Sequence, residues 1–283
     1  MSKSSQPPIP DEIRRYYDQV PEERRLLEGP SQLELARTQE VVLAHLPEPP
    51  ADILDVGGAA GAYSQWMATK GYRVCLIEPV PRLVEEARRR SEASASEGRW
   101  QCQVGDARQL EVDDASADAV LLLGPLYHLA LASDRLRALR EARRALRPGG
   151  VVFAAGISRF ASALDGLARD LFADPEFGAI VARDLKEGQH RNETARWDYF
   201  TTAYFHRPEE LRDEVVAAGF ECEKLVGLEG PGWILADFQE RWSDPRKKAD
   251  LLRVARALES EASIIGASAH LLAVGRKKGK DTR

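Results

Sequence analysis

The stretch ILDVGGAAGAYS, residues 53–64, decides how the chain folds. It passes from an apolar run into a cluster of glycines and alanines and then into residues suited to a helix. A turn with so few side chains lets backbone N–H groups and the start of the following helix approach a bound molecule. The stretch therefore predicts a ligand cradle between a strand and a helix.

The segments that follow predict an α/β fold. From residue 51 to about 156, short apolar runs alternate with longer amphipathic segments, which is typical of a parallel sheet with crossover helices. We expect five strands there, at 51–56, 72–78, 100–106, 117–124 and 150–156. Further on, we expect a helix at 207–220, a strand at 221–230, a long helix from about 236 to 260 and a last strand at 268–277.

Two parts of the chain lie outside this alternation. Residues 1–48 predict an N-terminal helical cap with helices at 11–21 and 31–47, ahead of a domain at 49–283. Residues 157 to about 207 are mixed, aromatic and histidine-bearing, with no clear strand, and indicate an insertion that forms a helical lid.

Composition excludes several classes of protein. The 283 residues carry a formal net charge of −5, so nucleic acid is an unlikely partner. No signal peptide and no apolar run of bilayer length is visible, and the three cysteines have no CxxC spacing. We expect a cytoplasmic protein with reduced cysteines, no membrane segment and no metal, since histidines and carboxylates lack ligand spacing. Monomer and homodimer both remain open.

The glycine turn has a specific pattern. Its acidic and small residues fit D-x-G-x-G-x-G with alanine at the central glycine, better than the dinucleotide fingerprint G-x-G-x-x-G. The segments Glu78, VGDARQL (104–110), LLLGPLYHL (121–129) and LRPGGVVF (146–153) follow in order. Together they resemble class I S-adenosylmethionine-dependent methyltransferases. The resemblance implies a Rossmann-like seven-stranded sheet with helices on both faces and an antiparallel last strand.

The resemblance also implies a cofactor, S-adenosyl-L-methionine, with S-adenosyl-L-homocysteine as the product. Glycines of the turn would pass beside the methionine part, Glu78 would bind the ribose, and Asp106 with Ala107 the adenine. Tyr17 belongs to a segment that resembles the N-terminal helix that folds over the cofactor in several relatives; a solvated amphipathic helix is the alternative. The implied cofactor residues are Tyr17, Asp55, Gly57, Gly58, Ala59, Gly61, Glu78, Pro79, Asp106, Ala107, Leu123 and Gly124. Alanine at 59 predicts a slight backbone shift without loss of binding.

Two residues are candidates for catalysis. GPLYHL, 124–129, leaves the fourth strand at the edge where open α/β sheets bind ligands, which makes Tyr127 and His128 candidate catalytic residues. Histidine suits removal of a proton from an acceptor hydroxyl or amine near neutral pH. The alternative is that Tyr127 packs against a neighbour and His128 only caps the backbone.

Candidate substrate residues come from the insertion, where aromatic and histidine side chains are dense enough to line an apolar pocket with polar groups. They are His190, Trp197, Tyr199, Tyr204 and His206. The alternative is that these rings fill the seam between insertion and sheet. The arginines of the N-terminal segment, Arg14, Arg15, Arg24 and Arg25, either reach an acidic substrate or form a solvated face.

The sequence thus predicts methyl transfer to an oxygen or nitrogen of a small organic acceptor, in specialised metabolism. Methylation of a peptide or RNA is the alternative within catalysis; GPLY in place of an N-P-P-Y tetrapeptide argues against RNA. A non-catalytic regulator that binds the cofactor is the alternative outside it.

Overall fold

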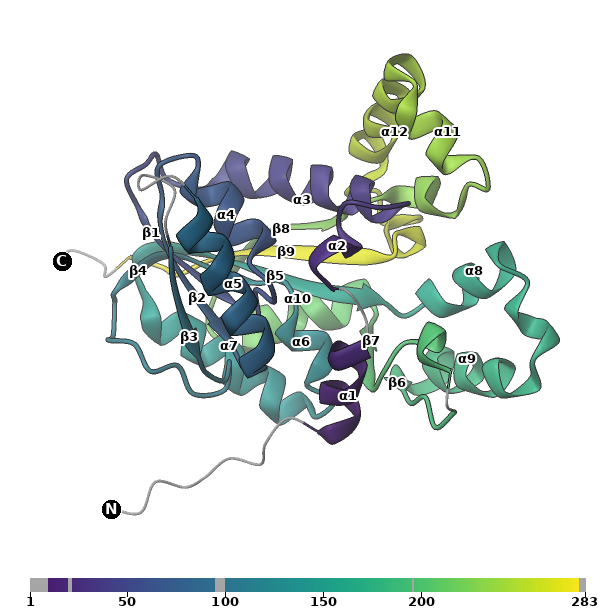
Figure 1. The fold of residues 1–283 in the computed structure, drawn as a ribbon, viewed down its shortest axis with the longest axis horizontal. Coiled ribbons are helices and arrows are strands. Elements are labelled where there is room, and N and C mark those ends of the chain that lie inside the picture. The colour runs from purple at the N-terminus through teal and green to yellow at the C-terminus, as the bar shows by residue number, and fades with distance from the viewer. Residues whose placement is uncertain (1–9, 20–21, 95–99, 195, 280–283) are drawn as a thin grey trace.

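The computed structural model describes residues 10–19, 22–94, 100–194 and 196–279 (Figure 1). Its strands form one nine-stranded sheet whose central part has the order β3-β2-β1-β4-β5. These five strands are all parallel. Their bounds are β1 (Asp52–Val56), β2 (Arg73–Glu78), β3 (Gln101–Val104), β4 (Ala117–Leu122) and β5 (Leu146–Ser158).

The sheet continues with the antiparallel strand that the sequence predicts. β9 (His270–Arg276) lies between β5 and β8 (Glu221–Gly227) and runs antiparallel to both. Seven strands therefore make the predicted Rossmann-like sheet, and the order changes direction at β1 and β4, where open α/β sheets bind ligands.

The insertion contains two strands, so the expectation that it has none is wrong. β7 (Ala203–His206) pairs in parallel with the end of β5, and β6 (Gln189–His190) pairs antiparallel with β7. The physical reason is the length of β5, which runs two residues beyond the predicted end at 156. Its last residues, Ile157 and Ser158, offer an edge for Phe205 and His206.

The long helix expected over 236–260 is also wrong, because it is broken into α11 (Phe238–Ser243) and α12 (Pro245–Leu258). Proline disfavours a helical conformation at the residue before it, and Asp244 is extended. The carboxylate of Asp244 accepts hydrogen bonds from the backbone N–H groups of Arg246 (2.8 Å) and Lys247 (3.0 Å), which starts the second helix.

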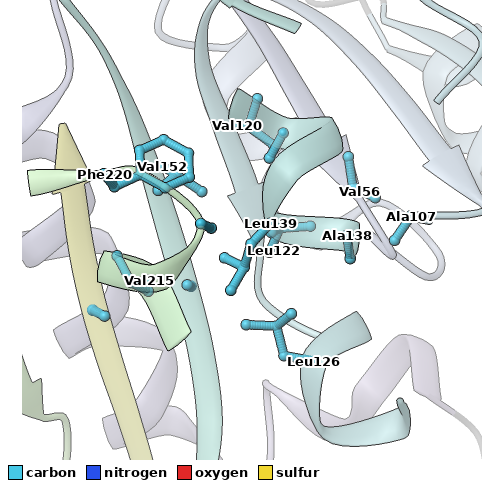
Figure 2. Close-up of a cluster of buried hydrophobic side chains, with 14 of the residues drawn as sticks. Val56, Ala107, Val120, Leu122, Leu126, Ala138, Leu139, Val152, Val215 and Phe220 are labelled. Carbon is cyan, nitrogen blue, oxygen red and sulfur yellow. The ribbon is translucent and has the colours of Figure 1, made fainter. Parts of the chain in front are cut away.

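Helices cover both faces of the sheet (Figure 1). On one face, residues of α3, α4 and α5 share a core with the strands. On the other face, α6, α7 and α10 pack over Val120, Leu122 and Val152, and Figure 2 shows Leu126, Leu139 and other side chains of this cluster. The helices are α3 (Ser31–His45), α4 (Ala62–Ala68), α5 (Pro81–Ala93), α6 (Pro125–His128), α7 (Ala132–Ala145) and α10 (Pro208–Ala217).

The remaining elements lie at the chain's N-terminal end, in the insertion and around α12. α1 (Asp11–Gln19) and α2 (Glu22–Arg25) precede α3, whereas residues 1–9 and 20–21 of the expected cap lie outside the described residues. α8 and α9 of the insertion project beyond the end of β5 (Figure 1). The other elements are α8 (Ala161–Ala168), η2 (Leu171–Ala173), α9 (Pro175–Glu187), η3 (Trp197–Tyr199), η4 (Gly230–Ile234) and η5 (Ile265–Ala267). Across the described ranges, every helix is too short or too polar to cross a bilayer.

Candidate active site

A cavity of about 300 Å³ lies beside the C-terminal ends of the parallel strands. Its wall is built from the segments that follow β1, β2, β3 and β4, together with side chains of the N-terminal helices. Of the twelve residues predicted to bind a cofactor, all except Gly61 line it. Gly61 starts α4 in the left-handed conformation, and its Cα faces the Trp100 ring instead.

The glycine turn after β1 is as tightly packed as its lack of side chains predicts. Gly57 has a φ of 71°, and a Cβ there would lie 2.7 Å from the ring of Pro125. A Cβ on Gly58 would lie 2.5 Å from the Asp55 carboxylate. Ala59 adopts a φ of 48°, a left-handed conformation that disfavours side chains, and this is where the sequence departs from glycine.

Asp55 is a buried carboxylate with an unsatisfied oxygen. One oxygen, Oδ2, accepts a hydrogen bond from the Ser64 hydroxyl at 2.6 Å, while Oδ1 has no hydrogen-bond partner although it is buried. Burial raises the pKa of Asp55 to about 6, and the Ser64 bond offsets only part of this. A cationic group in the cavity would satisfy Oδ1 and stabilise the ionised form.

Glu78, at the end of β2, holds the glycine turn in place. Its Oε2 accepts a hydrogen bond from the Ala59 N–H at 3.1 Å, and its Oε1 accepts one from the Val80 N–H at 2.9 Å. The bond to Ala59 supports the left-handed conformation of that residue. A carboxylate oxygen can accept more than one hydrogen bond, so Glu78 is chemically suited to bind hydroxyl groups of a ligand as well.

The wall after β3 carries a charged cluster. The Arg108 guanidinium donates to the Asp106 carboxylate at 2.7 Å and to Asp134 of α7 at 3.1 Å. The Arg108 N–H donates to Asp106 Oδ1 at 2.8 Å, which forms a tight turn. These bonds fix the backbone around Ala107, which lies on the cavity wall.

His128 lies at the end of α6 among aromatic rings. Its Nε2 is 2.6 Å from the Tyr17 hydroxyl, and its ring lies 4.7 Å from Tyr127 and 5.8 Å from Phe200 between centroids. Nδ1 faces the Thr202 carbonyl at 3.5 Å, an acceptor only, so we assign the hydrogen to Nδ1 and the acceptor role to Nε2. Burial lowers the pKa of His128 to about 4, so the ring is neutral near pH 7.

Comparison with known proteins places this geometry in a family. A family model described as a methyltransferase domain matches residues 54–154. The ubiquinone/menaquinone biosynthesis C-methyltransferase of Acidiphilium cryptum is 31% identical over 199 residues, which cover 68% of this chain and 75% of the relative. The chain belongs to the class I S-adenosylmethionine-dependent methyltransferases.

Other relatives of this methyltransferase give the same family. A ubiquinone biosynthesis O-methyltransferase of Methylocella silvestris is 36% identical over 189 residues, which cover 65% of each chain. Among solved structures, a methyltransferase from Methanosarcina mazei has a TM-score of 0.59 at 18% identity, covering 85% of this chain and 98% of the other. A possible histamine N-methyltransferase from Thermotoga maritima has a TM-score of 0.56 at 21% identity, covering 95% and 99%. At these identities, the structural likenesses establish the fold alone.

The cavity residues of the methyltransferase fit its cofactor. S-adenosylmethionine carries a cationic ammonium group and ribose hydroxyls, and the orphaned Oδ1 of Asp55 and the two oxygens of Glu78 are suitable acceptors for them. The turn at 57–59 contributes no side chain larger than a methyl group to the cavity wall, so a ligand can approach its backbone closely.

The five predicted substrate residues do not line this cavity. The His190 ring bonds to the carboxylate of Asp184 (2.9 Å) and the carbonyl of Tyr199 (2.8 Å), whose own hydroxyl donates to Asp174. The Tyr204 hydroxyl donates to Glu210, the His206 ring bonds to Glu214, and the Trp197 side chain is 61% exposed. The expectation is corrected accordingly: the side chains of His190 and Tyr199 bond within the insertion, those of Tyr204 and His206 bond to α10, and Trp197 faces solvent. Among the described residues of the insertion, Thr202 alone lines the cavity.

The cavity also includes residues that the sequence analysis did not assign. Tyr63 lines it from the first turn of α4, and Asp134 from the first turn of α7. Arg25 lines it from α2, although the sequence showed it only as one of several helical arginines. Both residues could have been predicted from the sequence, because each lies in the first turn of a helix that begins at the ligand-binding edge after β1 or β4.

Proposed function

We propose that this methyltransferase transfers the methyl group of S-adenosylmethionine to a hydroxyl oxygen of a small organic acceptor. One observation carries the choice of a hydroxyl: in the cavity, the Nε2 atom of the buried neutral His128 accepts a hydrogen bond from a hydroxyl group, that of Tyr17, at 2.6 Å. An acceptor hydroxyl that replaces the Tyr17 hydroxyl would present its proton to the same atom.

The cofactor part of the proposal rests on the turn and its two carboxylates. Asp55 accepts a hydrogen bond from the ammonium group and Glu78 from the ribose hydroxyls, while the segment around Asp106 and Ala107 contacts the adenine. Leu123, Gly124 and Pro79 lie on the same wall and complete the contact surface. We expected Tyr17 to contact the cofactor. Because its hydroxyl bonds to His128 Nε2, we propose instead that Tyr17 acts as a partner of His128.

The chemistry needs one base and a dry cavity. When bound, the cofactor supplies an electrophilic methyl group on its sulfonium. An acceptor oxygen would form the new bond to this methyl carbon as the carbon–sulfur bond breaks, and the sulfur would keep the electron pair. His128 Nε2 takes the hydroxyl proton, while Tyr127 and Leu26 on the cavity wall limit the entry of water. The products are the methyl ether, S-adenosylhomocysteine and one proton.

The cofactor half is tested by calorimetry with S-adenosylhomocysteine. We expect binding by the wild type and a loss of affinity of about 10–100-fold in Glu78→Ala, because each lost charge-assisted hydrogen bond contributes about 1.5–3 kcal/mol. Glu85→Ala is the matched control, since Glu85 is exposed on α5, pairs with Arg88 and lies outside the cavity wall. Equal affinity in wild type and Glu78→Ala would contradict the ribose assignment.

The acceptor half is tested by mass spectrometry. Wild-type protein is incubated with S-adenosylmethionine and a panel of small alcohols, phenols, amines and carbon acids, and each acceptor is examined for a gain of one methyl group. Methylation of hydroxyl compounds supports the proposal. Methylation confined to carbon or nitrogen would contradict the hydroxyl assignment, and cofactor binding without turnover on any member would favour a regulator.

A further inference from the structure

Arg135 is a buried arginine near the start of α7, and the proposed function gives it no role. It is only 2% exposed. A buried guanidinium costs free energy unless its N–H groups find acceptors. Each of its three nitrogen atoms donates at least one hydrogen bond, so the position and direction of this side chain are fixed.

One edge of the guanidinium holds the loop that follows His128. The Nη1 atom of Arg135 donates to the carbonyl oxygens of Leu129 and Ala130, each at 2.9 Å. These two residues come directly after His128, and both line the cavity. The Ala130 carbonyl also accepts a hydrogen bond from the side chain of Gln189 in β6 at 3.1 Å. The backbone that leaves His128 is therefore tied to α7 and to the insertion.

The rest of the guanidinium contacts α10 and the insertion. Its Nε and Nη2 atoms donate to the carboxylate of Glu214 in α10, with the shortest distance at 2.7 Å. Its central carbon lies 3.7 Å from the centre of the Tyr204 ring in β7, a cation–π contact. Thr202, two residues before Tyr204, supplies the carbonyl that faces His128 Nδ1 at 3.5 Å. Arg135 thus contacts both the loop after His128 and the strand that begins beside Thr202.

These contacts suit arginine because its planar fork donates from three nitrogen atoms and stacks on a ring, whereas lysine presents a single ammonium group. The hydrogen on His128 Nδ1, and with it the acceptor role of Nε2, depends on the Thr202 carbonyl staying in place. We propose that Arg135 is a positioning residue for His128: it fixes the loop after the histidine and the strand beside its carbonyl partner, and so keeps Nε2 as the acceptor. The inference rests on the proposed function, in which Nε2 is the base.

The first measurement is the protonation pattern of the His128 ring. Nitrogen NMR of histidine-labelled protein distinguishes a ring nitrogen that carries hydrogen from one that does not, and the signals of His128 are identified by their absence in His128→Ala. We expect hydrogen on Nδ1 in the wild type and a shift of hydrogen toward Nε2 in Arg135→Lys, which keeps the charge beside Glu214 but loses the fork. A role in folding alone would leave the ring pattern of the folded variant unchanged, and that result would overturn the inference.

The second measurement is the rate of methyl transfer in a single turnover, with the compound of the acceptor panel that gains a methyl group fastest. Arg135→Lys should lower this rate by about 10–100-fold, because a small misplacement of a catalytic group has an effect of that size. Calorimetry should give wild-type affinity for S-adenosylhomocysteine, since Arg135 does not line the cavity. An unchanged transfer rate would overturn the inference, because the orientation of His128 would then not limit the reaction.

A double variant shows whether Arg135 acts through His128. In His128→Ala the base is absent, so the further change Arg135→Lys should slow the single-turnover rate by no more than about twofold. An equal loss with and without the histidine would contradict the positioning role, since Arg135 would then act on another group.

Arg144→Lys is the matched control. Arg144 lies in the last turn of the same helix and likewise donates to two loop carbonyls, those of Leu110 and Val112, both at 2.8 Å, and to the carboxylate of Glu141. Neither of these loop residues lines the cavity. We expect the wild-type ring pattern and transfer rate in this variant, and a loss equal to that of Arg135→Lys would count against a specific role of Arg135.

Tyr204→Leu is measured in the same way if Arg135→Lys does not fold. It removes the ring beside the guanidinium and leaves the bonds to Glu214, so the ring pattern and the rate should change in the same direction; no change in either would overturn the inference. Failure of the proposed function is distinguishable. The wild type would then methylate none of the hydroxyl compounds in the panel, whereas the NMR measurement would still decide whether Arg135 positions His128.

Discussion

The cavity wall and the insertion that follows β5 differ in how well the sequence predicts which side chains line the cavity. Both contain residues that the sequence suggests are functional. In the wall, the predicted residues from Asp55 to Gly124 lie around one cavity, with Gly61 alone set aside. In the insertion, none of the five predicted side chains reaches it.

The difference shows which patterns carry positional information. A glycine turn after a strand lies at the ligand-binding edge, since parallel strands bring their C-terminal ends together. Aromatic density carries no such constraint, because rings fill a core as readily as they line a pocket. His190 stacks on Phe205 at 4.7 Å and bonds to buried Asp184, so its polar atoms are satisfied within the insertion.

The sharpest test of the cavity wall is His128→Ala. Loss of a general base lowers kcat by about 10²–10⁴-fold, equivalent to about 3–5 kcal/mol, while affinity for S-adenosylhomocysteine stays within a few-fold of wild type. With a pKa of about 4, the wild-type His128 remains neutral above about pH 5, so its titration should not lower kcat between pH 8 and pH 6. Steady-state kinetics across that range measure both effects, and an undiminished kcat in the variant would assign His128 to packing.

The matching test in the insertion is His190→Ala. The change removes the His190 bond to the buried Asp184 carboxylate and leaves the bond from the Ser162 hydroxyl, which destabilises the protein by about 3–5 kcal/mol. Urea unfolding measures the loss of stability, and calorimetry with S-adenosylhomocysteine should give wild-type affinity under native conditions. A large loss of cofactor affinity in a folded variant would show that His190 contributes to cofactor binding. The cavity wall and the insertion would then not differ in function as described.

Asp55→Asn tests whether the buried, ionised carboxylate of Asp55 destabilises the folded protein. Because the folded-state pKa is raised to about 6 from 3.8, ionised Asp55 destabilises the fold above pH 6, and this penalty disappears below about pH 4, where the group is protonated in both states. We expect the variant to be more stable than wild type by about 1–3 kcal/mol at pH 8, with no difference near pH 4. Denaturation at both pH values measures this, and a variant destabilised at pH 8 would contradict it.

The smallest effect is expected for Trp197→Ala. This side chain is 61% exposed and is absent from the cavity wall, so its removal should change the free energy of unfolding by about 0.5 kcal/mol or less. Cofactor affinity and turnover should match the wild type. A selective increase in KM for the acceptor would show that the exposed ring takes part in substrate binding after all.

The sequence by itself determined the framework and its chemistry. The alternation of strands and helices and the order of motifs from Asp55 to Arg147 fixed the parallel sheet, the family and the cofactor class, because these depend on local spacing and on the edge that parallel strands share. The break at Asp244-Pro245 was also readable in principle, since proline restricts the residue before it.

Tertiary structure decided which polar side chains meet. Tyr17 and His128 are 111 residues apart, and Arg25 depends on Glu34, which in turn depends on His270 near the other end of the chain. Such partners are chosen by packing of the N-terminal helices and β9 against the sheet, and no local pattern records that packing. For the same reason, the partners of the insertion's histidines are found only in the folded chain: His190 bonds to Asp184 and Tyr199, and His206 bonds to Glu214. The Nδ1 of His206 and the Oδ1 of Asp55 are buried without a hydrogen-bond partner.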